Sequence, residues 1–246
     1  MKWIPIKIIE EDGVKMPKGK NGDISIIIRT KNEERWIGHT LQSVIDELDK
    51  PEIIIVDNNS QDKTLEIVRH FIQEPKLATK NNLNPNFTKI KILKVKDYTP
   101  GKSINYGVSK ASNNFIMIIS AHCVLNKINL SKHKKDLNKH VAVFGNQIPK
   151  WNGKKILKRY IWSHFTNKEV TNMFSKLENR FFLHNAIALY KKKFLKKEPF
   201  NSNLLGKEDR YWANQMIKKK KSILYDPKLE VDHHYTPNGN TWKGMA

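Results

Sequence analysis

Two short runs of β-branched residues near the start of the chain each stop abruptly at polar and acidic residues. The first is SIIIRTKNEE, residues 25–34, and the second is EIIIVDNNSQDKT, residues 52–64. A helical spacing of apolar residues follows each run. Continuous apolar strands that alternate with helices are typical of a parallel sheet buried on both faces. Ligands bind at the carboxyl ends of the strands in such sheets, so these polar strand ends are candidates for a binding site.

The same alternation continues along the chain and indicates one α/β domain. Strands are predicted over 24–29, 53–57, 90–95, 115–119 and 141–144, the last ended by Gly145, and helices over 36–48, from about 62, and over 101–111. Residues 77–88 are expected to form a loop or insertion. The stretch 149–177 is basic, helical and poorly periodic, and beyond it we predict a strand over 182–190, a helix over 208–219, a short strand over 222–225 and an extended segment over 230–236.

No repeat, linker or composition shift marks a domain boundary. We therefore predict a single domain over 1–246, with a nucleotide-type half at about 24–145 and an elaborated half at about 146–246 that shapes a second ligand site.

Composition narrows the class of protein. Hydrophobic residues make up 39% of the 246 residues and aromatic residues 9%, which is too many for a disordered chain. No apolar run approaches the length of a membrane span, and the start of the chain lacks a signal-peptide pattern. The single cysteine, Cys123, cannot form an intrachain disulfide, which fits a cytoplasmic location.

The charge is strongly positive: 45 Lys and Arg face 24 Asp and Glu, a formal net charge of +21. Such a field favours nucleic acid, anionic membrane surfaces or phosphorylated substrates, although a surface simply solvated by lysine explains it equally well. The lysine clusters at 191–193, 196–197 and 218–221 lack interleaved aromatic residues that would stack on bases. We therefore expect no nucleic-acid partner, and a peripheral position on the anionic inner face of a membrane as a hypothesis.

Several segments, in their order and spacing, resemble the family 2 glycosyltransferases. The resemblance is carried by SIIIRTKNEERWIGHTLQSV, EIIIVDNNSQDKT, YTPGKSINYGVSKA, FIMIISAHCVL, FFLHNAIALYKKKF, GKEDRYW and YDPKLEVDHHYT, and it covers most of residues 24–236. The segment GNQIP, residues 145–149, is most similar to bacterial surface-polysaccharide enzymes, including rhamnosyltransferase-like members. The resemblance implies an inverting enzyme with an α/β GT-A fold, a mostly parallel central sheet flanked by helices, a UDP-, dTDP- or GDP-sugar donor, and a glycan or lipid-linked acceptor.

The resemblance also implies which residues bind the nucleotide-sugar. They are Thr30, Asn32, Glu33, Asp57, Asn59, Lys102, Asn105, Ser120 and His122. Asp57 would accept from a base N–H or a ribose hydroxyl, and the alternative is that it only shapes the turn that caps the next helix. Lys102 would offset the charge that grows on a departing diphosphate, and the alternative is a solvated loop lysine.

The segment Ser120-Ala121-His122 departs from the family pattern. Many GT-A enzymes carry Asp-x-Asp here and hold a divalent cation with it, so the loss of both carboxylates argues against ordinary Mg²⁺ or Mn²⁺ binding. His122 could ligate Mn²⁺ or donate to a phosphate. Adjacent side chains of a strand point to opposite faces, so of the pair His233-His234 only one, His233, is expected to join it. The alternative is a set of packing histidines.

The acidic pair Glu208-Asp209 begins a predicted helix, where carboxylates also serve as ordinary caps. In the resembling family an acidic pair at this point supplies the base, so we predict Asp209 as general base and Glu208 as a supporting group. His184 and Asn185 match a strand that borders the acceptor site, and Trp242 could close over the site. Two further functions stay open: a GT-A-like nucleotide- or glycan-binding domain without activity, and a nucleotidyltransferase, which the missing glycine-rich phosphate loop disfavours.

Overall fold

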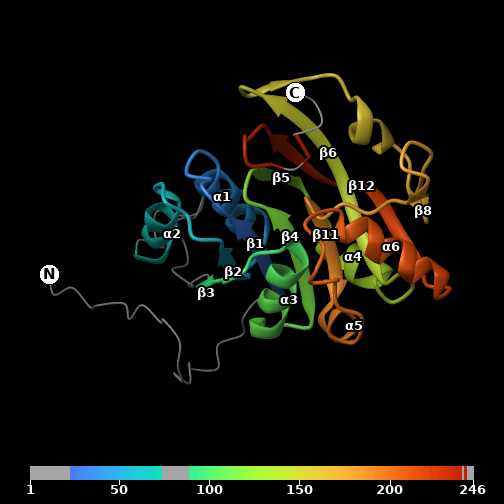
Figure 1. Ribbon diagram of the computed structural model, residues 1–246, viewed down its shortest axis with the longest axis horizontal. Helices are drawn as coiled ribbons and strands as arrows, with labels where there is room; N and C mark the ends of the chain where they lie inside the picture. Colours follow the sequence, from blue (N-terminus) through green and yellow to red (C-terminus); the bar gives the residue numbers. More distant parts are fainter. Residues whose placement is uncertain (1–22, 74–88, 240, 243–246) are drawn as a thin grey trace, which may run out of the picture.

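A computed structural model describes residues 23–73, 89–239, 241 and 242 (Figure 1). Its centre is a ten-stranded sheet in the order β3-β2-β1-β4-β11-β6-β12-β5, with β7 beside β6 and β8 beside β12. The four strands β3 (Lys89–Lys94), β2 (Glu52–Asp57), β1 (Ile24–Thr30) and β4 (Phe115–Ser120) run parallel, as the sequence predicts for the first half. The predicted loop at 77–88 lies outside the described residues.

Helices cover both faces of this sheet because the buried strands alternate the direction of their side chains. Ile26, Ile28, Ile53 and Ile55 pack with α1 (Ile37–Glu47) and α2 (Thr64–Gln73). Ile27 and Ile54 point the other way and share a core with α3 (Pro100–Lys110), α5 (Lys192–Lys197) and α6 (Glu208–Lys218). The fold is therefore the predicted mixed α/β fold with a mostly parallel centre flanked by helices.

Strand β6 (Ala142–Trp151) corrects the prediction that Gly145 ends a strand at this point. The strand continues through Gly145, and the glycine is needed for close packing instead. A Cβ atom at Gly145 would lie 2.3 Å from the carbonyl oxygen of Leu229. Leu229 lies in β12 (Ile223–His234), where the pairing with β6 shifts between Asp226 and Glu230.

Strand β12 also replaces the two separate segments predicted at 222–225 and 230–236. It is one continuous strand with an irregularity, parallel to β6 and antiparallel to β5 (Cys123–Lys127). Neither β5 nor α4 (Leu130–Asp136), which follows it, is predicted from the sequence. Both depend on partners about a hundred residues away, and local periodicity does not report such pairings.

The stretch 149–177, which the sequence predicts to be helical, differs most from its prediction. It and the residues up to 181 hold a single 3₁₀ turn, η2 (Tyr160–His164), and four short strands. These strands are β7 (Lys154–Lys155), β8 (Val170–Thr171), β9 (Phe174–Ser175) and β10 (Arg180–Phe181). The strand predicted over 182–190 is shorter, with β11 at Ile187–Lys191. Trp162 and Phe165 lie in or next to one 3₁₀ turn and pack into the core from there. Their burial therefore does not require a longer helix with an apolar face.

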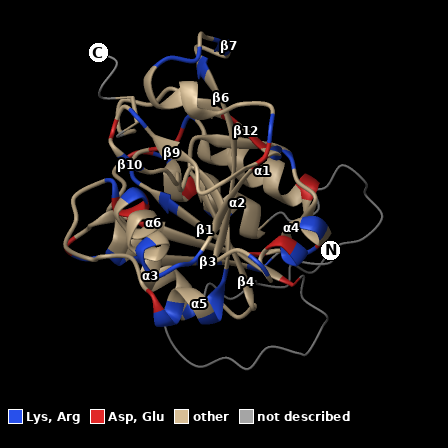
Figure 2. Cartoon of the chain, turned by 90° about the vertical axis from the view of Figure 1, so that its right-hand side faces the viewer, with Lys and Arg blue, Asp and Glu red and all other residues tan. Residues whose placement is uncertain are grey.

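No helix among the described residues combines the length and the apolar character that a membrane crossing requires. Basic residues are spread over several elements, among them α4, α5 and α6 (Figure 2).

Candidate active site at the carboxyl ends of the strands

The parallel register brings the predicted strand-end residues to one edge of the sheet. Thr30 lies opposite Asp57, and Arg29 opposite Ser120. The loops that follow β1 and β2 are joined by hydrogen bonds. The backbone N–H of Asn32 donates to Ser60 Oγ at 3.0 Å, and the backbone N–H of Glu33 donates to Thr64 Oγ1 at 2.7 Å. The two polar strand ends therefore form one continuous surface.

Asp57 is buried, and both of its carboxylate oxygens accept from Ser60. Oδ1 accepts from the Ser60 hydroxyl at 2.6 Å and Oδ2 from the Ser60 amide at 3.1 Å. The adjacent Thr30 hydroxyl is buried without a hydrogen-bond partner among the described residues, whereas Asn59 is exposed. Asp57 thus shapes the turn before the next helix, which is the alternative role considered for it from the sequence. Its contact with a nucleotide stays a prediction.

Lys102 and Asn105 both lie on α3 but differ in their surroundings. The Lys102 ammonium is half-exposed, 3.8 Å from the carboxylate of Asp97. The Asn105 amide donates to the Phe200 carbonyl at 2.7 Å and accepts from the Phe200 amide at 3.1 Å. Asn105 therefore ties α3 to the segment before α6, and its predicted place beside a diphosphate stays untested.

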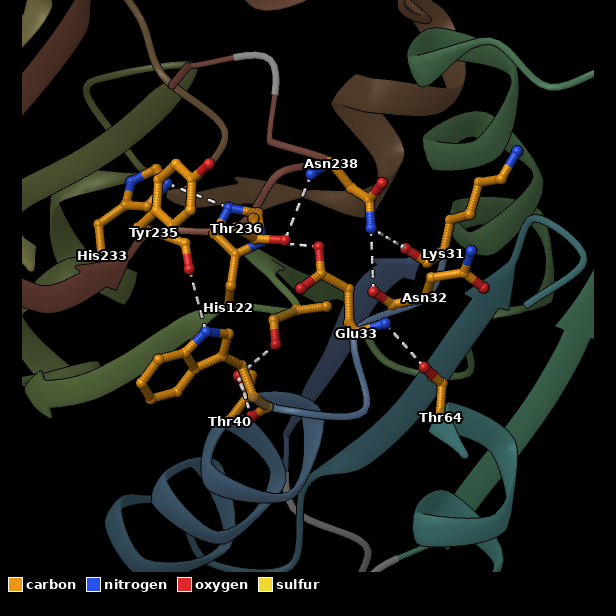
Figure 3. Close-up of polar contacts among 12 residues, drawn as sticks. Lys31, Asn32, Glu33, Thr40, Thr64, His122, His233, Tyr235, Thr236 and Asn238 are labelled. Carbon is orange, nitrogen blue, oxygen red and sulfur yellow. Dashed lines mark hydrogen bonds and ion pairs between the residues drawn. The ribbon is translucent and has the colours of Figure 1, made fainter. Parts of the chain in front are cut away.

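His122 lies between Glu33 of the loop after β1 and His233 of β12 (Figure 3). Its Nδ1 lies 3.0 Å from Glu33 Oε1, and its Nε2 lies 3.1 Å from His233 Nε2. On the far side, His233 Nδ1 lies 2.8 Å from Gln147 Oε1. Sequence reasoning missed Gln147, although it named the segment GNQIP that contains it. The result is a chain of four polar groups, Glu33, His122, His233 and Gln147.

The protons of this chain can be assigned from the hydrogen-bond partners. The Glu33 carboxylate only accepts, so His122 Nδ1 carries a proton, and in a neutral His122 the Nε2 atom then carries a lone pair. If Gln147 presents its oxygen to His233, His233 Nε2 is also a lone pair and the two face one another. If the Gln147 side-chain amide is flipped, its nitrogen donates to His233 Nδ1. His233 Nε2 then carries the proton and donates it to His122 Nε2, so each of the four groups is hydrogen-bonded to the next. The Gln147 Nε2 has no partner in the first arrangement.

The two arrangements of Gln147 decide what the pair of histidines can bind. With the amide oxygen toward His233, the two lone pairs converge as they do around one cation. Imidazole nitrogen suits transition-metal ions better than Mg²⁺, which prefers oxygen. The described residues hold no group of three His, Cys, Asp or Glu side chains placed for a metal. The two imidazole nitrogens are candidate ligands for a cation, and their role in metal binding stays a prediction.

His233 and His234 point to different surroundings, as their adjacency on a strand predicts. His233 is buried edge-on to Trp162, while His234 stacks on Trp36 with ring centroids 3.8 Å apart. Burial lowers the pKa of His233 well below its ordinary value, helped by the nearby His122. Burial also lowers the pKa of His234, to about 4. Both imidazoles are therefore neutral at pH 7.

The acidic pair lies in the first turn of α6, after Lys207 in the left-handed conformation. Asp209 Oδ2 accepts from the backbone N–H of Asn185 at 3.0 Å, and Asp209 Oδ1 accepts from the backbone N–H of Arg210 at 2.8 Å. Glu208 instead pairs with the Arg29 guanidinium at 3.4 Å. Burial raises the pKa of Glu208, opposed by Arg29 and reinforced by the charge of Asp209. The backbone of Asn185 thus orients Asp209, and Arg29 holds Glu208.

Sequence reasoning missed Arg29. Burial by itself would lower the pKa of this guanidinium, but Tyr98 and the carboxylates of Glu208 and Asp209 raise it. A largely buried arginine at a strand end is unusual, and its position directly before Thr30 is the signal that could have marked it.

His184 and Asn185 support the acidic pair from the segment that leads into β11. His184 Nδ1 accepts from the Ala186 amide at 3.1 Å, and burial lowers the pKa of this histidine to about 4. Asn185 Oδ1 accepts from the Tyr190 hydroxyl at 2.5 Å, while its Nδ2 is buried without a hydrogen-bond partner among the described residues. Their predicted contact with an acceptor stays untested.

The segment after β12 crosses the site (Figure 3). Asn238 Nδ2 donates to the carbonyl oxygens of Lys31 at 3.2 Å and Asn32 at 3.0 Å. Thr241 Oγ1 lies 3.3 Å from His184 Nε2, and Trp242 packs against Trp162 with ring centroids 5.3 Å apart. The segment therefore connects the loop after β1 with the surroundings of the acidic pair.

The chain is similar to solved structures of sugar-transferring enzymes. It superposes on residues 1–349 of Staphylococcus aureus TarS in complex with UDP-GlcNAc with a TM-score of 0.62 and 21% identity, over 88% of this chain and 60% of that one. The mannosyltransferase PcManGT from Pyrobaculum calidifontis, in complex with GDP-Man and Mn²⁺, gives a TM-score of 0.64 and 16% identity, over 91% and 60%. These similarities establish the fold as the GT-A glycosyltransferase fold.

Two curated relatives match part of the sequence. Poly(ribitol-phosphate) beta-N-acetylglucosaminyltransferase TarS of Staphylococcus aureus (strain Mu50 / ATCC 700699) is 28% identical over 120 residues, which are 47% of this chain and 19% of TarS. Dolichyl N-acetyl-alpha-D-glucosaminyl phosphate 3-beta-D-2,3-diacetamido-2,3-dideoxy-beta-D-glucuronosyltransferase of Methanococcus voltae is 33% identical over 103 residues, 40% of this chain and 29% of that protein. The match thus spans less than a third of either relative's length.

Fold and site together define a protein of the glycosyltransferase class with GT-A architecture. The family model described as Glycosyl transferase family 2 matches residues 25–198, which is well over half of the chain. The chain belongs to this family.

Proposed function

We propose that the chain transfers a sugar from a nucleotide-sugar donor to a hydroxyl group of an acceptor, with inversion at the anomeric carbon. The observation that carries this proposal is the placement of Asp209. Its carboxylate is oriented by the backbone of Asn185 at the same end of the sheet as the polar loops after β1 and β2. A carboxylate in that position can take the proton that the acceptor hydroxyl loses as it attacks.

The proposed roles follow the arrangement of the site. The loops around Thr30, Asn32 and Asp57 bind the nucleotide, and the half-exposed Lys102 stabilises charge on the departing diphosphate. Asp209 takes the acceptor proton. Glu208, held by Arg29, supports the acceptor or the base. The attacking oxygen forms the new glycosidic bond as the bond to the nucleoside diphosphate breaks on the opposite side.

His122 and His233 are the residues that would hold a divalent cation. Such an ion, when bound, would neutralise diphosphate charge. The neighbour in complex with Mn²⁺ supports this proposal, as do the two imidazole nitrogens, which suit a transition-metal ion better than Mg²⁺.

The names of the relatives support a choice of donor and acceptor. The solved relatives are in complex with UDP-GlcNAc, UDP or GDP-Man, so a UDP- or GDP-sugar is the first donor to test. The curated relatives are named for poly(ribitol-phosphate) and a dolichyl-linked sugar phosphate. We propose a glycan or lipid-linked acceptor, at the inner face of an anionic membrane.

The test is a donor panel followed by variants. Titration calorimetry with UDP-, dTDP- and GDP-sugars, each in Mn²⁺, Mg²⁺ or EDTA, should show selective binding of one donor class. Asp209→Asn should keep that binding and lower the rate of transfer by about 10²-fold or more. Glu169→Gln, a partly exposed acidic residue paired with Lys132, serves as the matched control and should keep full activity.

Three outcomes would contradict the proposal. If no nucleotide-sugar in the panel binds, the chain has no binding site for these donors. Binding without transfer by the unaltered chain indicates an inactive binding domain. Full activity in Asp209→Asn excludes Asp209 as the base, and Glu208→Gln then tests its neighbour.

A further inference from the structure

Arg29 connects the carboxyl end of β1 with the start of α6. Its backbone pairs with Val56 of β2 on one side and with Ser120 of β4 on the other, so it lies among the polar strand ends. Its guanidinium reaches Glu208, with 3.4 Å between Nη1 and Oε1, and is hydrogen-bonded to Tyr98, which lies before α3. The Arg29 side chain is 18% exposed and that of Glu208 6%, so water and salt screen this ion pair little.

The acidic pair carries two neighbouring charges in a buried place. Burial disfavours the ionised form of a carboxyl group, and each carboxylate disfavours the ionisation of the other. Both oxygens of Asp209 accept from backbone N–H groups, whereas Glu208 pairs with Arg29. Even with Arg29 in place, burial and the charge of Asp209 raise the pKa of Glu208 above its ordinary value. Loss of the guanidinium would therefore favour a proton on the pair.

The other ionisable groups around the pair do not supply this positive charge. Arg210, the next residue of α6, faces Glu178 instead, with 3.2 Å between Nε and Oε2. His184, before β11, is neutral at pH 7 because burial lowers its pKa to about 4. Tyr190, in β11, is neutral as well because burial raises its pKa well above the ordinary value. Among the described residues around the pair, the compensating charge therefore comes from Arg29.

A proton on the acidic pair would interfere with the proposed transfer. Asp209 has to accept the proton of the acceptor hydroxyl while that oxygen attacks the anomeric carbon, and it needs a free lone pair to do so. Because the charges of Glu208 and Asp209 act on each other, the two carboxyl groups titrate as a pair rather than singly. A proton bound by the pair therefore lies on Asp209 for part of the time and occupies that lone pair.

We propose that Arg29 is a positioning residue for the transfer: its guanidinium holds Glu208 and keeps both carboxylates of the acidic pair ionised, so that Asp209 is free to take the acceptor proton at neutral pH. The inference rests on the proposed function. Arg29 acts through the acidic pair and without contact with the donor, because its guanidinium is turned toward Glu208 and Tyr98.

Carbon-13 NMR of the side-chain carboxyl groups tests the proposal on the chain without donor or acceptor. The lines of the acidic pair are identified by their absence from Glu208→Gln and Asp209→Asn, and they are followed against pH. In Arg29→Gln the titration midpoint should lie about one unit or more higher than in the unaltered chain, because a neighbouring opposite charge is lost. Arg29→Lys keeps the charge and should move the midpoint less than half as far. Arg69→Gln, which alters an arginine of α2 on the opposite face of the sheet, is the matched control and should leave it unchanged.

The rate at which the donor releases its nucleoside diphosphate, measured against pH, gives a second readout. In Arg29→Gln the acid limb of this profile should move to higher pH together with the carboxyl midpoint, and the rate should recover as the pH rises. A merely structural role of Arg29 would lower the rate at every pH. The double variant Arg29→Gln with Glu208→Gln removes both partners of the ion pair, so it should fold even where Arg29→Gln does not. Its acid limb should return toward that of Glu208→Gln alone.

Donor binding, measured by calorimetry on the same samples, separates this proposal from the proposed function. Arg29→Gln should bind the nucleotide-sugar as the unaltered chain does. Absence of donor binding in the unaltered chain would overturn the proposed function, whereas the carboxyl titration would still show whether Arg29 keeps the pair ionised. Equal midpoints in Arg29→Gln and the unaltered chain would overturn the role of Arg29. Loss of donor binding in Arg29→Gln with an unchanged midpoint would also overturn it, and would indicate that the guanidinium binds the donor.

Discussion

At the scale of single residues, a histidine pair lies where the acidic motif is missing. His122 replaces a carboxylate, but its Nδ1 is held by Glu33 and its Nε2 faces His233. Gln147 determines which nitrogen of His233 carries the proton, because an amide either donates or accepts according to its orientation. With a neutral His122, the orientation of this glutamine therefore determines whether the two Nε2 atoms present two lone pairs or share one proton.

Gln147→Leu should weaken Mn²⁺ binding by 10- to 100-fold, because it removes the group that orients His233. Electron paramagnetic resonance of free Mn²⁺ measures this affinity in the presence of the donor nucleotide. Equal Mn²⁺ affinity in Gln147→Leu and the unaltered chain would show that Gln147 does not control ion binding at the histidine pair.

His184 should make the folded state sensitive to acid. Its pKa is about 4 in the folded chain because of burial, against about 6.5 when unfolded. The unfolded state then binds more protons between these values, so stability falls as pH falls from about 6.5 toward 4. Between pH 7 and pH 5 this one group costs about 2 kcal/mol.

Urea unfolding at pH 7 and pH 5 measures the effect of His184, with His184→Asn as comparison. The variant should lose about 2 kcal/mol less than the unaltered chain over this range. Parallel losses in both proteins would show that His184 is not the responsible group.

At the scale of elements, the close packing of β6 against β12 depends on the absence of a side chain at Gly145. Gly145→Ala should destabilise the fold by about 1–3 kcal/mol, because its Cβ would meet the backbone of Leu229 in β12. Gly38→Ala, in the first turn of α1, is the matched control: its Cβ makes an ordinary contact of 3.4 Å with Ile67, and alanine has a higher helix propensity than glycine. Thermal unfolding should show opposite shifts, and equal shifts would contradict the packing argument.

The elements that the sequence predicts well carry their own local signals. Helix α3 begins at Pro100 after Thr99, whose side chain accepts from the Lys102 amide, and it lies within one residue of its predicted limits. Helix α6 begins at the predicted Glu208. Strand β5 and the continuous β12 carry no comparable signal, since their formation depends on pairing with each other.

At the scale of the whole molecule, the positive charge is uneven. Residues 146–246 contain 21 Lys and Arg and 8 Asp and Glu, so this half carries +13 of the net +21. Three exposed lysines of this half, Lys193, Lys196 and Lys197, lie on α5 (Figure 2). An anionic surface should therefore attract the proposed acceptor-binding half more strongly than the nucleotide-binding half.

Co-sedimentation with phosphatidylcholine vesicles, with and without phosphatidylglycerol, tests the membrane hypothesis. Binding should require the anionic lipid and be lost between about 0.05 and 0.5 M salt, as the Debye length shortens. Lys196→Glu with Lys197→Glu should weaken it more than the matched pair Lys63→Glu and Lys139→Glu, which are exposed in the other half. Binding that ignores salt and lipid charge would contradict the hypothesis.

The sequence by itself determined the parallel half of the sheet, its flanking helices and the family resemblance, because local periodicity and strand-end residues carry that information. Only the tertiary structure decided that Gln147 meets His233 and that Arg29 pairs with Glu208. The two residues of each of these pairs, Gln147 with His233 and Arg29 with Glu208, are at least 86 positions apart in the sequence. No local sequence pattern reports contacts over such separations. Long-range burial chooses the partners, so the chemistry of the site appears only once the chain is folded.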